Sequence, residues 1–311
     1  MIQQIRKRLG RVKCLLIDEL PYRNATQSIA GIREEYRQLL ARIPPVSGGG
    51  GEDVEVHMLC GTGGADMGMW ASWSLMRYFP AGTLILHSDG SLTADDLQPW
   101  RRLIPNLVHV TKEEGDRMSQ ERLEGRHPAL AAWRPGNPYS IKAIDSHLFG
   151  KQPRIIVIDS DVLCFSKPTE LLENLANPDV NFSWNEDERS CYVVPRAQLE
   201  ALVGHAVPDL FNTGLLVTKR YDESDLSILN ETFLKLATAG PTHTGWFEQS
   251  LTAVVAGRLG KGVPLGPEYR VVAGKTKRSA VTRHFVGVNR TRFRFFKEGI
   301  PRLLEGLDIN A

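Results

Sequence analysis

From residue 54 onward, apolar segments of strand length alternate with stretches that have helical periodicity. The strand-length segments are 54–60, 83–87, 107–110, 154–158 and 211–218, and the helical stretches are 67–78, 94–103, 139–149, 226–237 and 245–256. Strands and helices that alternate at this rhythm predict an α/β fold with helices on both faces of a sheet. The sequence contains no internal repeat that would favour a solenoid or a propeller.

The segment before residue 54 has a different character. Residues 45–53 read PVSGGGGED, and four consecutive glycines behave as flexible chain. We therefore expect two parts, residues 1–52 as an N-terminal helical segment with its glycine-rich linker and residues 53–311 as the main domain. Apolar residues recur at helical spacing over 28–42, which predicts an amphipathic helix that packs on its own domain. Peripheral contact with a membrane surface stays open, because basic residues precede this helix at Arg6, Lys7, Arg8, Arg11 and Lys13.

Composition and cysteine usage restrict the class of protein and its compartment. The 311 residues are 42% hydrophobic and 24% charged, as in folded globular proteins. No run of about 18 apolar residues exists, and Asp18 and Glu19 interrupt the N-terminal apolar stretch, so we expect neither a transmembrane segment nor a signal peptide. The widely spaced cysteines form no metal-binding or C-x-x-C pattern, which indicates a reducing, cytoplasmic location; they are Cys14, Cys60, Cys164 and Cys191.

Charge is nearly balanced overall but uneven along the chain. The formal net charge of +2 argues against nucleic acid as a partner. Between Lys275 and Arg302, however, nine basic residues face a single acid, Glu298. Such a concentration suits a phosphate-bearing ligand, although a solvated basic tail is the plainer explanation.

The triplet Asp159-Ser160-Asp161 carries the strongest chemical signal. It follows the apolar run 154–158 directly and precedes another at 162–165. Open α/β sheets bind ligands at the carboxyl ends of their strands, so the two carboxylates are expected to meet a ligand there. Paired oxygen ligands suit a hard divalent cation such as Mn²⁺ or Mg²⁺.

Two enzyme classes place such a triplet after a buried strand. Haloacid-dehalogenase-like phosphatases use the first aspartate as a nucleophile, whereas metal-dependent nucleotide-sugar glycosyltransferases use both aspartates to bind the metal. The phosphatase interpretation requires the triplet on an early strand and an adjacent acidic pair downstream. Here the triplet comes late and no two downstream aspartates are adjacent, so the phosphatase is the second choice.

Four segments in a fixed order resemble glycosyltransferase family eight and related GT-A enzymes. They are 139–163, Phe211-Asn212-Thr213-Gly214, Glu248-Gln249 and His284-Phe285-Val286-Gly287. The resemblance covers about residues 54–300 and implies a GT-A fold, a Rossmann-like mixed sheet flanked by helices. It also implies a hexosyltransferase-like enzyme that moves a sugar from a nucleoside diphosphate, expected to be UDP, to an unidentified glycan, lipid or protein acceptor.

The same resemblance implies the metal ligands. Asp159 and Asp161 would bind the Mn²⁺ or Mg²⁺ that bridges the donor diphosphate, with His284 as third ligand. The family pattern His-x-x-Gly-x-x-Lys appears here as His284, Gly287 and Arg290. Arginine in place of lysine keeps the positive charge but changes the geometry of a phosphate contact. The alternative for His284 is a core residue, because a lone histidine in an apolar segment is more often a core residue than a metal ligand.

Further residues are expected at the nucleotide sugar. Lys142 precedes the first motif aspartate by 17 residues, where similar enzymes carry a basic residue, and Ser160 lies between the two metal ligands. The loop that begins at Gly61 lacks the Gly-Lys-Ser/Thr of a P-loop, and the resemblance makes it a wall of the nucleoside pocket, with Asp89 at its border. A solvent-facing lysine and plain glycine turns are the competing explanations.

The reacting end of the site is expected at Glu248, Gln249 and Asn212. Glu248-Gln249 stands where the resembled family has Asp-Gln near the anomeric carbon, and the extra methylene leaves the acceptor geometry open. Glu248 could orient an acceptor hydroxyl or act as a general base, and Asn212 could position sugar or acceptor. The same fold could also bind a sugar nucleotide or glycan without transferring anything, because fold does not fix function.

Overall fold

The computed structural model describes residues 25–47, 54–287, 289–305 and 307, and all structural statements concern these residues. The glycine run, Cys14 and the basic residues 6–13 lie outside them. Within the described part of the chain, no helix combines the length and the apolar character needed to cross a bilayer.

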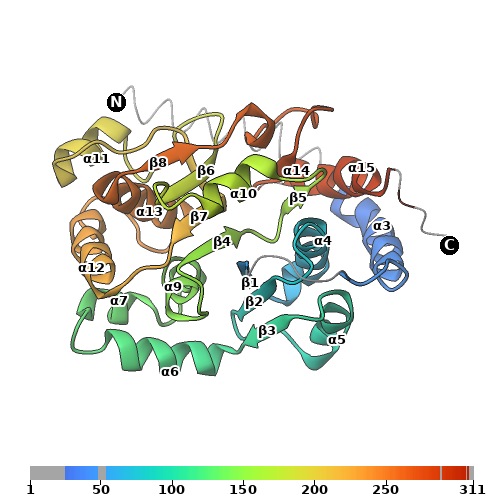
Figure 1. Cartoon of the computed structure of the whole chain (residues 1–311), viewed down its shortest axis with the longest axis horizontal. Coiled ribbons are helices and arrows are strands. Elements are labelled where there is room, and N and C mark those ends of the chain that lie inside the picture. Colours follow the sequence, from blue (N-terminus) through green and yellow to red (C-terminus); the bar gives the residue numbers. More distant parts are fainter. Residues whose placement is uncertain (1–24, 48–53, 288, 306, 308–311) are drawn as a thin grey trace.

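A seven-stranded mixed sheet forms the centre of the molecule (Figure 1). In spatial order its strands are β3 (Leu107–Val110), β2 (Thr83–Ser88), β1 (Glu55–Cys60), β4 (Arg154–Ile158), β7 (Phe211–Lys219), β6 (Phe182–Glu186) and β8 (Gly262–Pro264). The strands from β3 to β4 pair in parallel, β7 is antiparallel to both of its neighbours, and β8 pairs in parallel with β6. A two-stranded antiparallel sheet, β5 (Val162–Cys164) with β9 (Thr282–His284), lies beyond the end of β4.

The central strands form because their apolar runs are covered on both sides. Four of the five residues of β4 are buried, and so are eight of the nine residues of β7. A parallel strand buried on both faces appears in sequence as a continuous apolar run, which is the pattern that predicts β4 here. All five expected strands are confirmed, with bounds that differ by at most one residue.

Helices cover both faces of the sheet, as expected, and each face has its own core. One core includes side chains from α3 (Ala25–Leu40), α4 (Ala65–Met76), α5 (Ala94–Leu103), α10 (Thr169–Ala176), the π-helix Phe295–Gly299 and α15 (Ile300–Leu304). The other includes side chains from α6 (Lys112–Leu123), α7 (Pro128–Trp133), α11 (Arg196–Val203), α12 (Glu223–Ala237) and α13 (Gly245–Leu259). The described residues also form α14 (Asn289–Arg294) and two 3-10 helices, Thr62–Gly64 and Pro267–Tyr269. A continuous helical stretch over 138–148 consists of α8 (Pro138–Ser140), a π-helix (Ile141–Asp145) and α9 (Ser146–Leu148).

Local capping explains where several helices begin. Thr93, Thr111 and Asp222 each accept a hydrogen bond from the backbone N–H three residues later, and an acidic side chain at that later position bonds back to the cap. These reciprocal bonds satisfy backbone donors that the first helical turn leaves without intrahelical partners. The five helices expected after residue 54 are confirmed, and the additional helices are α6, α7, α10, α11, α14 and α15.

The N-terminal helix α3 packs on the main body of the protein. Ile29 and Leu40 are buried in the same core as β1 and α4. The Arg33 guanidinium forms two hydrogen bonds to Asp66, of 2.8 and 2.7 Å, at the first turn of α4. The predicted amphipathic helix over 28–42 is thus confirmed as one over 25–40, while the division of the chain at residue 52 stays a prediction.

Candidate functional site

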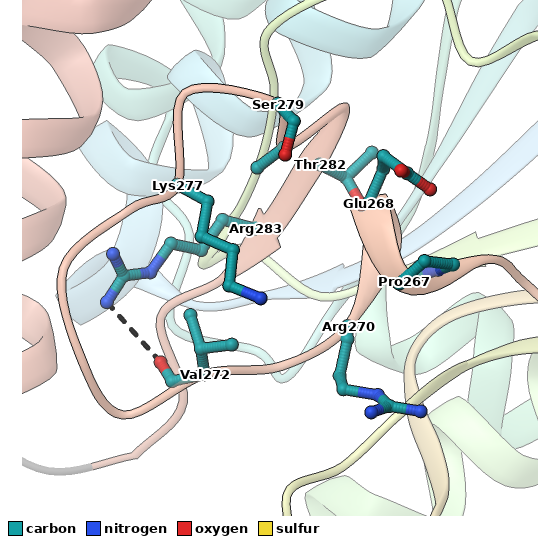
Figure 2. Close-up of a pocket in the computed structure, with 9 residues that line it drawn as sticks. Pro267, Glu268, Arg270, Val272, Lys277, Ser279, Thr282 and Arg283 are labelled. Atoms are coloured by element: carbon teal, nitrogen blue, oxygen red, sulfur yellow. Dashed lines mark hydrogen bonds between the residues drawn. The ribbon is translucent and has the colours of Figure 1, made fainter.

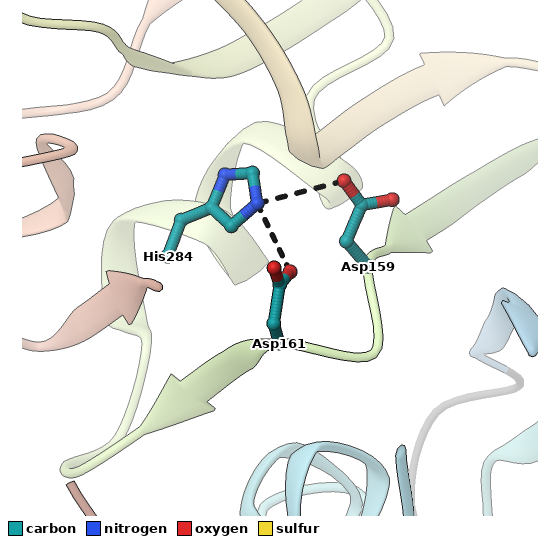
Figure 3. A group of neighbouring side chains, drawn as sticks. All are labelled: Asp159, Asp161 and His284. Carbon is teal, nitrogen blue, oxygen red and sulfur yellow. Dashed lines mark ion pairs between the residues drawn. The ribbon is translucent and has the colours of Figure 1, made fainter. Parts of the chain in front are cut away.

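The aspartate triplet lies where β4 leaves the central sheet and the chain enters β5. Asp159 still belongs to the edge of the sheet, because its backbone N–H donates to the Gly214 carbonyl at 2.8 Å. After Asp161 the chain pairs with β9, and this pairing sets Val162 opposite His284. The small sheet therefore carries the distant histidine to the two carboxylates (Figure 3).

The three predicted metal ligands converge in space. His284 Nε2 lies 3.0 Å from Asp161 Oδ1 and 3.6 Å from Asp159 Oδ2. One ligand atom from each residue lies within 4.8 Å of the others, a separation that a single divalent cation can bridge. The His284 side chain is 4% exposed, whereas those of Asp159 and Asp161 are 29% and 20% exposed, so the group is fixed on one side and accessible on the other.

The charges in this group stabilise one another. Burial by itself lowers the pKa of His284, but the adjacent Asp161 carboxylate outweighs burial and the pKa is raised. Burial likewise acts to raise the pKa of Asp161, and the His284 side chain brings it below the usual range. A carboxylate pair with one buried imidazole is a donor set that fits Mn²⁺, and it also accepts Mg²⁺ through oxygen ligands.

Lys142 enters the group from the π-helix within 138–148. Its Nζ lies 2.6 Å from Asp159 Oδ1, 3.1 Å from Thr213 Oγ1 and 3.8 Å from Glu248 Oε2. Burial opposes the ammonium charge, yet the carboxylates of Asp159 and Glu248 raise the pKa of Lys142. The lysine is therefore a buried cation directed into the site and not a solvent-facing helix residue; single π-turns inside helices are frequent at functional sites.

Glu248 lies in the first turn of α13, and its side chain is buried. Thr213 Oγ1 donates to Glu248 Oε2 at 2.9 Å, and Thr252 Oγ1 lies 3.4 Å from Oε1. Burial raises the pKa of Glu248, and Lys142 opposes the rise. The neighbouring Gln249 donates through Nε2 to the Cys191 carbonyl at 3.0 Å. The catalytic roles of these two side chains stay predictions.

Three of the expected nucleotide contacts gather at the carboxyl ends of β1, β2 and β4. A Cβ on Gly61 would overlap the Asp89 carboxylate as it lies in this structure, so the glycine leaves room for the Asp89 side chain. A Cβ on Gly64 would lie 3.5 Å from Ser160 Oγ. The loops that carry Asp89 and Ser160, which lie 28 and 99 residues after Gly61 in the sequence, are thus close to the glycine loop. Their contact with a nucleotide stays a prediction.

The residues on either side of His284 differ in their surroundings. Gly287 has φ of +67°, a left-handed conformation that favours glycine, and the Arg290 side chain lies outside the described residues. Arg283 is buried and donates to the carbonyls of Gly274 and Val272, at 2.7 and 3.4 Å (Figure 2). It therefore holds the loop that leads into β9, and the use of this basic segment for a diphosphate stays a prediction.

The cavity beside Arg283 is too small for a substrate. Its volume is about 10 Å³, roughly the space of one water, and Lys277, Arg270 and Glu268 are among the side chains that line it (Figure 2). Arg270 pairs there with Glu186. This cavity therefore does not hold a substrate, and the cluster of Asp159, Asp161 and His284 is the better candidate for the functional site.

Two contributors to the site were not among the expected residues. Thr213, inside the quoted motif, joins Lys142 to Glu248 through its hydroxyl. Asp187 lies just after β6 and accepts a hydrogen bond from Asn212 at 3.0 Å. Thr213 could have been found from its place between Asn212 and Gly214, whereas no local sequence signal marks Asp187.

Solved structures with a similar fold are glycosyltransferases. The apo form of mouse xyloside xylosyltransferase 1 matches at 13% identity and a TM-score of 0.51, over 75% of this chain and 98% of that one. The galactosyltransferase LgtC, in complex with donor and acceptor sugar analogues, matches at 14% and 0.51, over 82% of this chain and 96% of that one. The bifunctional glycosyltransferase WbbM matches at 14% and 0.52, over 83% of this chain and 51% of that one.

No protein-family model matches the sequence, and no curated protein sequence is significantly similar to it. At this level of identity the matches establish the fold. The chain has the mixed-sheet α/β fold of these glycosyltransferases over most of its length, and the GT-A fold expected from the four motifs is confirmed.

Proposed function

We propose that this protein is a metal-dependent glycosyltransferase that moves a sugar from a nucleoside diphosphate, UDP in the first instance, to a glycan, lipid or protein acceptor. The observation that carries the proposal is the convergence of Asp159, Asp161 and His284 at the carboxyl edge of the sheet. Their ligand atoms come from two segments more than 120 residues apart, which β5 and β9 bring together. The cytoplasm is the compartment that its cysteine usage favours.

In this proposal Asp159, Asp161 and His284 hold Mn²⁺ or Mg²⁺. The metal, when bound, would offset the negative charge that develops on the leaving diphosphate. Lys142 adds a fixed positive charge next to Asp159. Arg290, three residues after Gly287, would add a second positive charge at the diphosphate. Gly61, Asp89 and Ser160 would border the nucleoside and the phosphates.

The reacting end of the donor would lie near Glu248, Gln249 and Asn212. Glu248 is buried and its oxygens are engaged by Thr213 and Thr252, so its geometry supports fixing Lys142 more than removing a proton from an acceptor. Gln249, the next residue of α13, is proposed to contact the sugar.

The haloacid-dehalogenase-like phosphatase loses support. Such an enzyme needs Asp159 free to attack phosphorus, but Asp159 Oδ1 is held by Lys142 at 2.6 Å and Oδ2 faces His284. The fold also aligns with glycosyltransferases over most of the chain. A protein that binds a sugar nucleotide without transferring the sugar remains the alternative to be separated by experiment.

Calorimetric titration with UDP tests the proposal. We expect binding in the presence of Mn²⁺, and loss of that binding with EDTA or in the variant Asp161→Ala. The matched control is Asp179→Ala, which removes an exposed carboxylate that pairs only with Lys261 at the surface among the described residues. Equal UDP binding with and without metal would refute the metal site, and slow hydrolysis of a UDP-sugar would exclude a binding-only protein.

A further inference from the structure

A chain of hydrogen bonds runs behind the histidine of the metal-ligand group. His284 Nδ1 lies 2.9 Å from Asn212 Oδ1, and Asn212 Nδ2 donates to Asp187 Oδ2 at 3.0 Å. The three side chains are 4%, 2% and 8% exposed, in that order. None of the contacts in this chain involves the face of His284 that points to Asp159 and Asp161.

The orientation of the Asn212 amide follows from its partners. Its Oδ1 accepts a hydrogen bond from the Gly214 backbone N–H at 2.9 Å, and a backbone N–H can only donate. Its Nδ2 faces a carboxylate of Asp187, which accepts. If the amide were flipped, Nδ2 would face the Gly214 N–H and Oδ1 would face the Asp187 carboxylate, and both hydrogen bonds would be lost. The oxygen of Asn212 is therefore fixed toward the imidazole.

This fixed oxygen determines which ring nitrogen of His284 carries a proton. Because Asn212 Oδ1 has no hydrogen to give, Nδ1 of His284 must be the donor in this contact. In the neutral ring that binds a cation, Nε2 is then the nitrogen with the available lone pair, and it is the one directed at Asp159 and Asp161. Metal-bound histidines commonly donate their second N–H in this way, and that bond sets the ring orientation.

The backbone beneath the ring fixes its position as well. A Cβ on Gly214 would overlap the His284 ring, so the imidazole lies directly on the glycine backbone. Gly214 belongs to an irregularity in the pairing of β6 with β7: Trp184 pairs with Leu216, but the next residue, Asn185, pairs with Asn212. Such bulges re-aim side chains next to active sites.

We infer that Asp187 and Asn212 are positioning residues that hold His284 with Nδ1 protonated and Nε2 presented to the metal. This inference rests on the proposed function, since it assigns a purpose to the same metal site. It gives Asn212 a role toward the metal ligand in addition to the sugar contact proposed above: Oδ1 contacts Gly214 and His284, and Nδ2 donates one hydrogen bond to Asp187.

An exchange of the amide and the carboxylate tests the inference. In Asn212→Asp two carboxylates would oppose each other at about the present 3.0 Å contact, and in the double variant with Asp187→Asn the hydrogen bond is restored with donor and acceptor reversed. We expect Asn212→Ala and Asn212→Asp to weaken Mn²⁺ binding by about 10- to 100-fold. The double variant should recover at least about tenfold over Asn212→Asp, a result that general damage to the fold would not produce.

Two readouts separate positioning from stability. Mn²⁺ affinity is measured by electron paramagnetic resonance, and ¹⁵N chemical shifts of His284 report which ring nitrogen is protonated. The control is Asn230→Ala, which removes a partly buried amide that accepts from the backbone N–H groups of Ala129 and Leu130, away from the metal ligands. It should leave both readouts unchanged.

The outcomes distinguish this inference from the proposed function. If the unmodified protein binds no Mn²⁺, the proposed function fails and the inference fails with it. If it binds Mn²⁺ and folded Asn212→Ala binds equally well, only the inference is overturned. Absence of recovery in the double variant would overturn it too, even where Asn212→Ala does not fold.

Discussion

Replacing Lys142 with methionine removes the cation that Asp159 and Glu248 share. The Lys142 side chain is 9% exposed and that of Glu248 is 5% exposed, with 3.8 Å between Nζ and Oε2. Removing one partner of a buried ion pair costs about 3–5 kcal/mol, because the other charge is left without compensation. Asp159 is 29% exposed and can be hydrated, so we assign the loss mainly to Glu248 and expect about 3 kcal/mol near pH 8.

The loss must depend on pH if this reasoning is right. Burial already raises the pKa of Glu248 above 4.5, and without Lys142 the pKa rises further. A carboxyl group with a raised folded-state pKa contributes stability below its unfolded pKa, and that contribution is lost as pH rises through the folded pKa. The deficit of Lys142→Met should therefore be small near pH 4.5 and grow above it by up to about 1.4 kcal/mol per pH unit.

Urea unfolding at pH 5 and pH 8, each compared with the unmodified protein at the same pH, measures this deficit. The double variant Lys142→Met with Glu248→Gln should recover most of the loss at pH 8, because it leaves no buried carboxylate without a cation. The control Lys219→Met breaks a different pair, in which Nζ lies 2.7 Å from Asp225 Oδ2, close to the 2.6 Å between Lys142 and Asp159. An equal deficit at both pH values, or no recovery in the double variant, would refute the argument.

Three further predictions concern the surroundings of the site. Gly214→Ala should weaken Mn²⁺ binding in a resonance titration by about tenfold or more, because the new methyl group displaces His284. Burial lowers the pKa of His147 to about 3, so the protein loses stability as pH falls below 6.5, and His147→Asn should remove about 2 kcal/mol of the decrease in unfolding free energy between pH 7 and pH 5. Arg33→Ala should lower the unfolding free energy by only about 0.5–1 kcal/mol in urea, because Arg33 is 38% exposed where it pairs with Asp66.

Elements whose signal is local could be predicted from the sequence. The helix at 94–103 and the strands at 107–110 and 154–158 have the bounds that their apolar patterns predict. In contrast, β6, β8 and β9 were not among the expected strands. They have three to five residues each, with polar residues, glycine or proline among them, and form only because distant strands pair with them.

The residues of the site also differ in whether a local sequence signal predicts them. The three proposed metal ligands lie in motifs, and motif order was enough to associate Asp159 with His284, which converge in space across more than 120 residues. Asp187 follows a strand that has no apolar pattern, and its contact with Asn212 depends on the irregular pairing of β6 with β7. A pairing register between two strands cannot be obtained from either strand alone.

Glu248 stands where the resembled glycosyltransferases have aspartate, and the distance to Lys142 gives a physical explanation for the longer side chain. Lys142 Nζ reaches Asp159 at 2.6 Å and is anchored by Thr213, which fixes where the ammonium lies. Glu248 Oε2 is 3.8 Å away, at the limit of an ion pair. An aspartate at the same backbone position would withdraw its carboxylate by about 1.5 Å, one carbon–carbon bond, and lose both this pair and the bond to Thr213. The longer acid therefore belongs with this lysine, and the two positions are best understood as one unit that sets the charge beside Asp159.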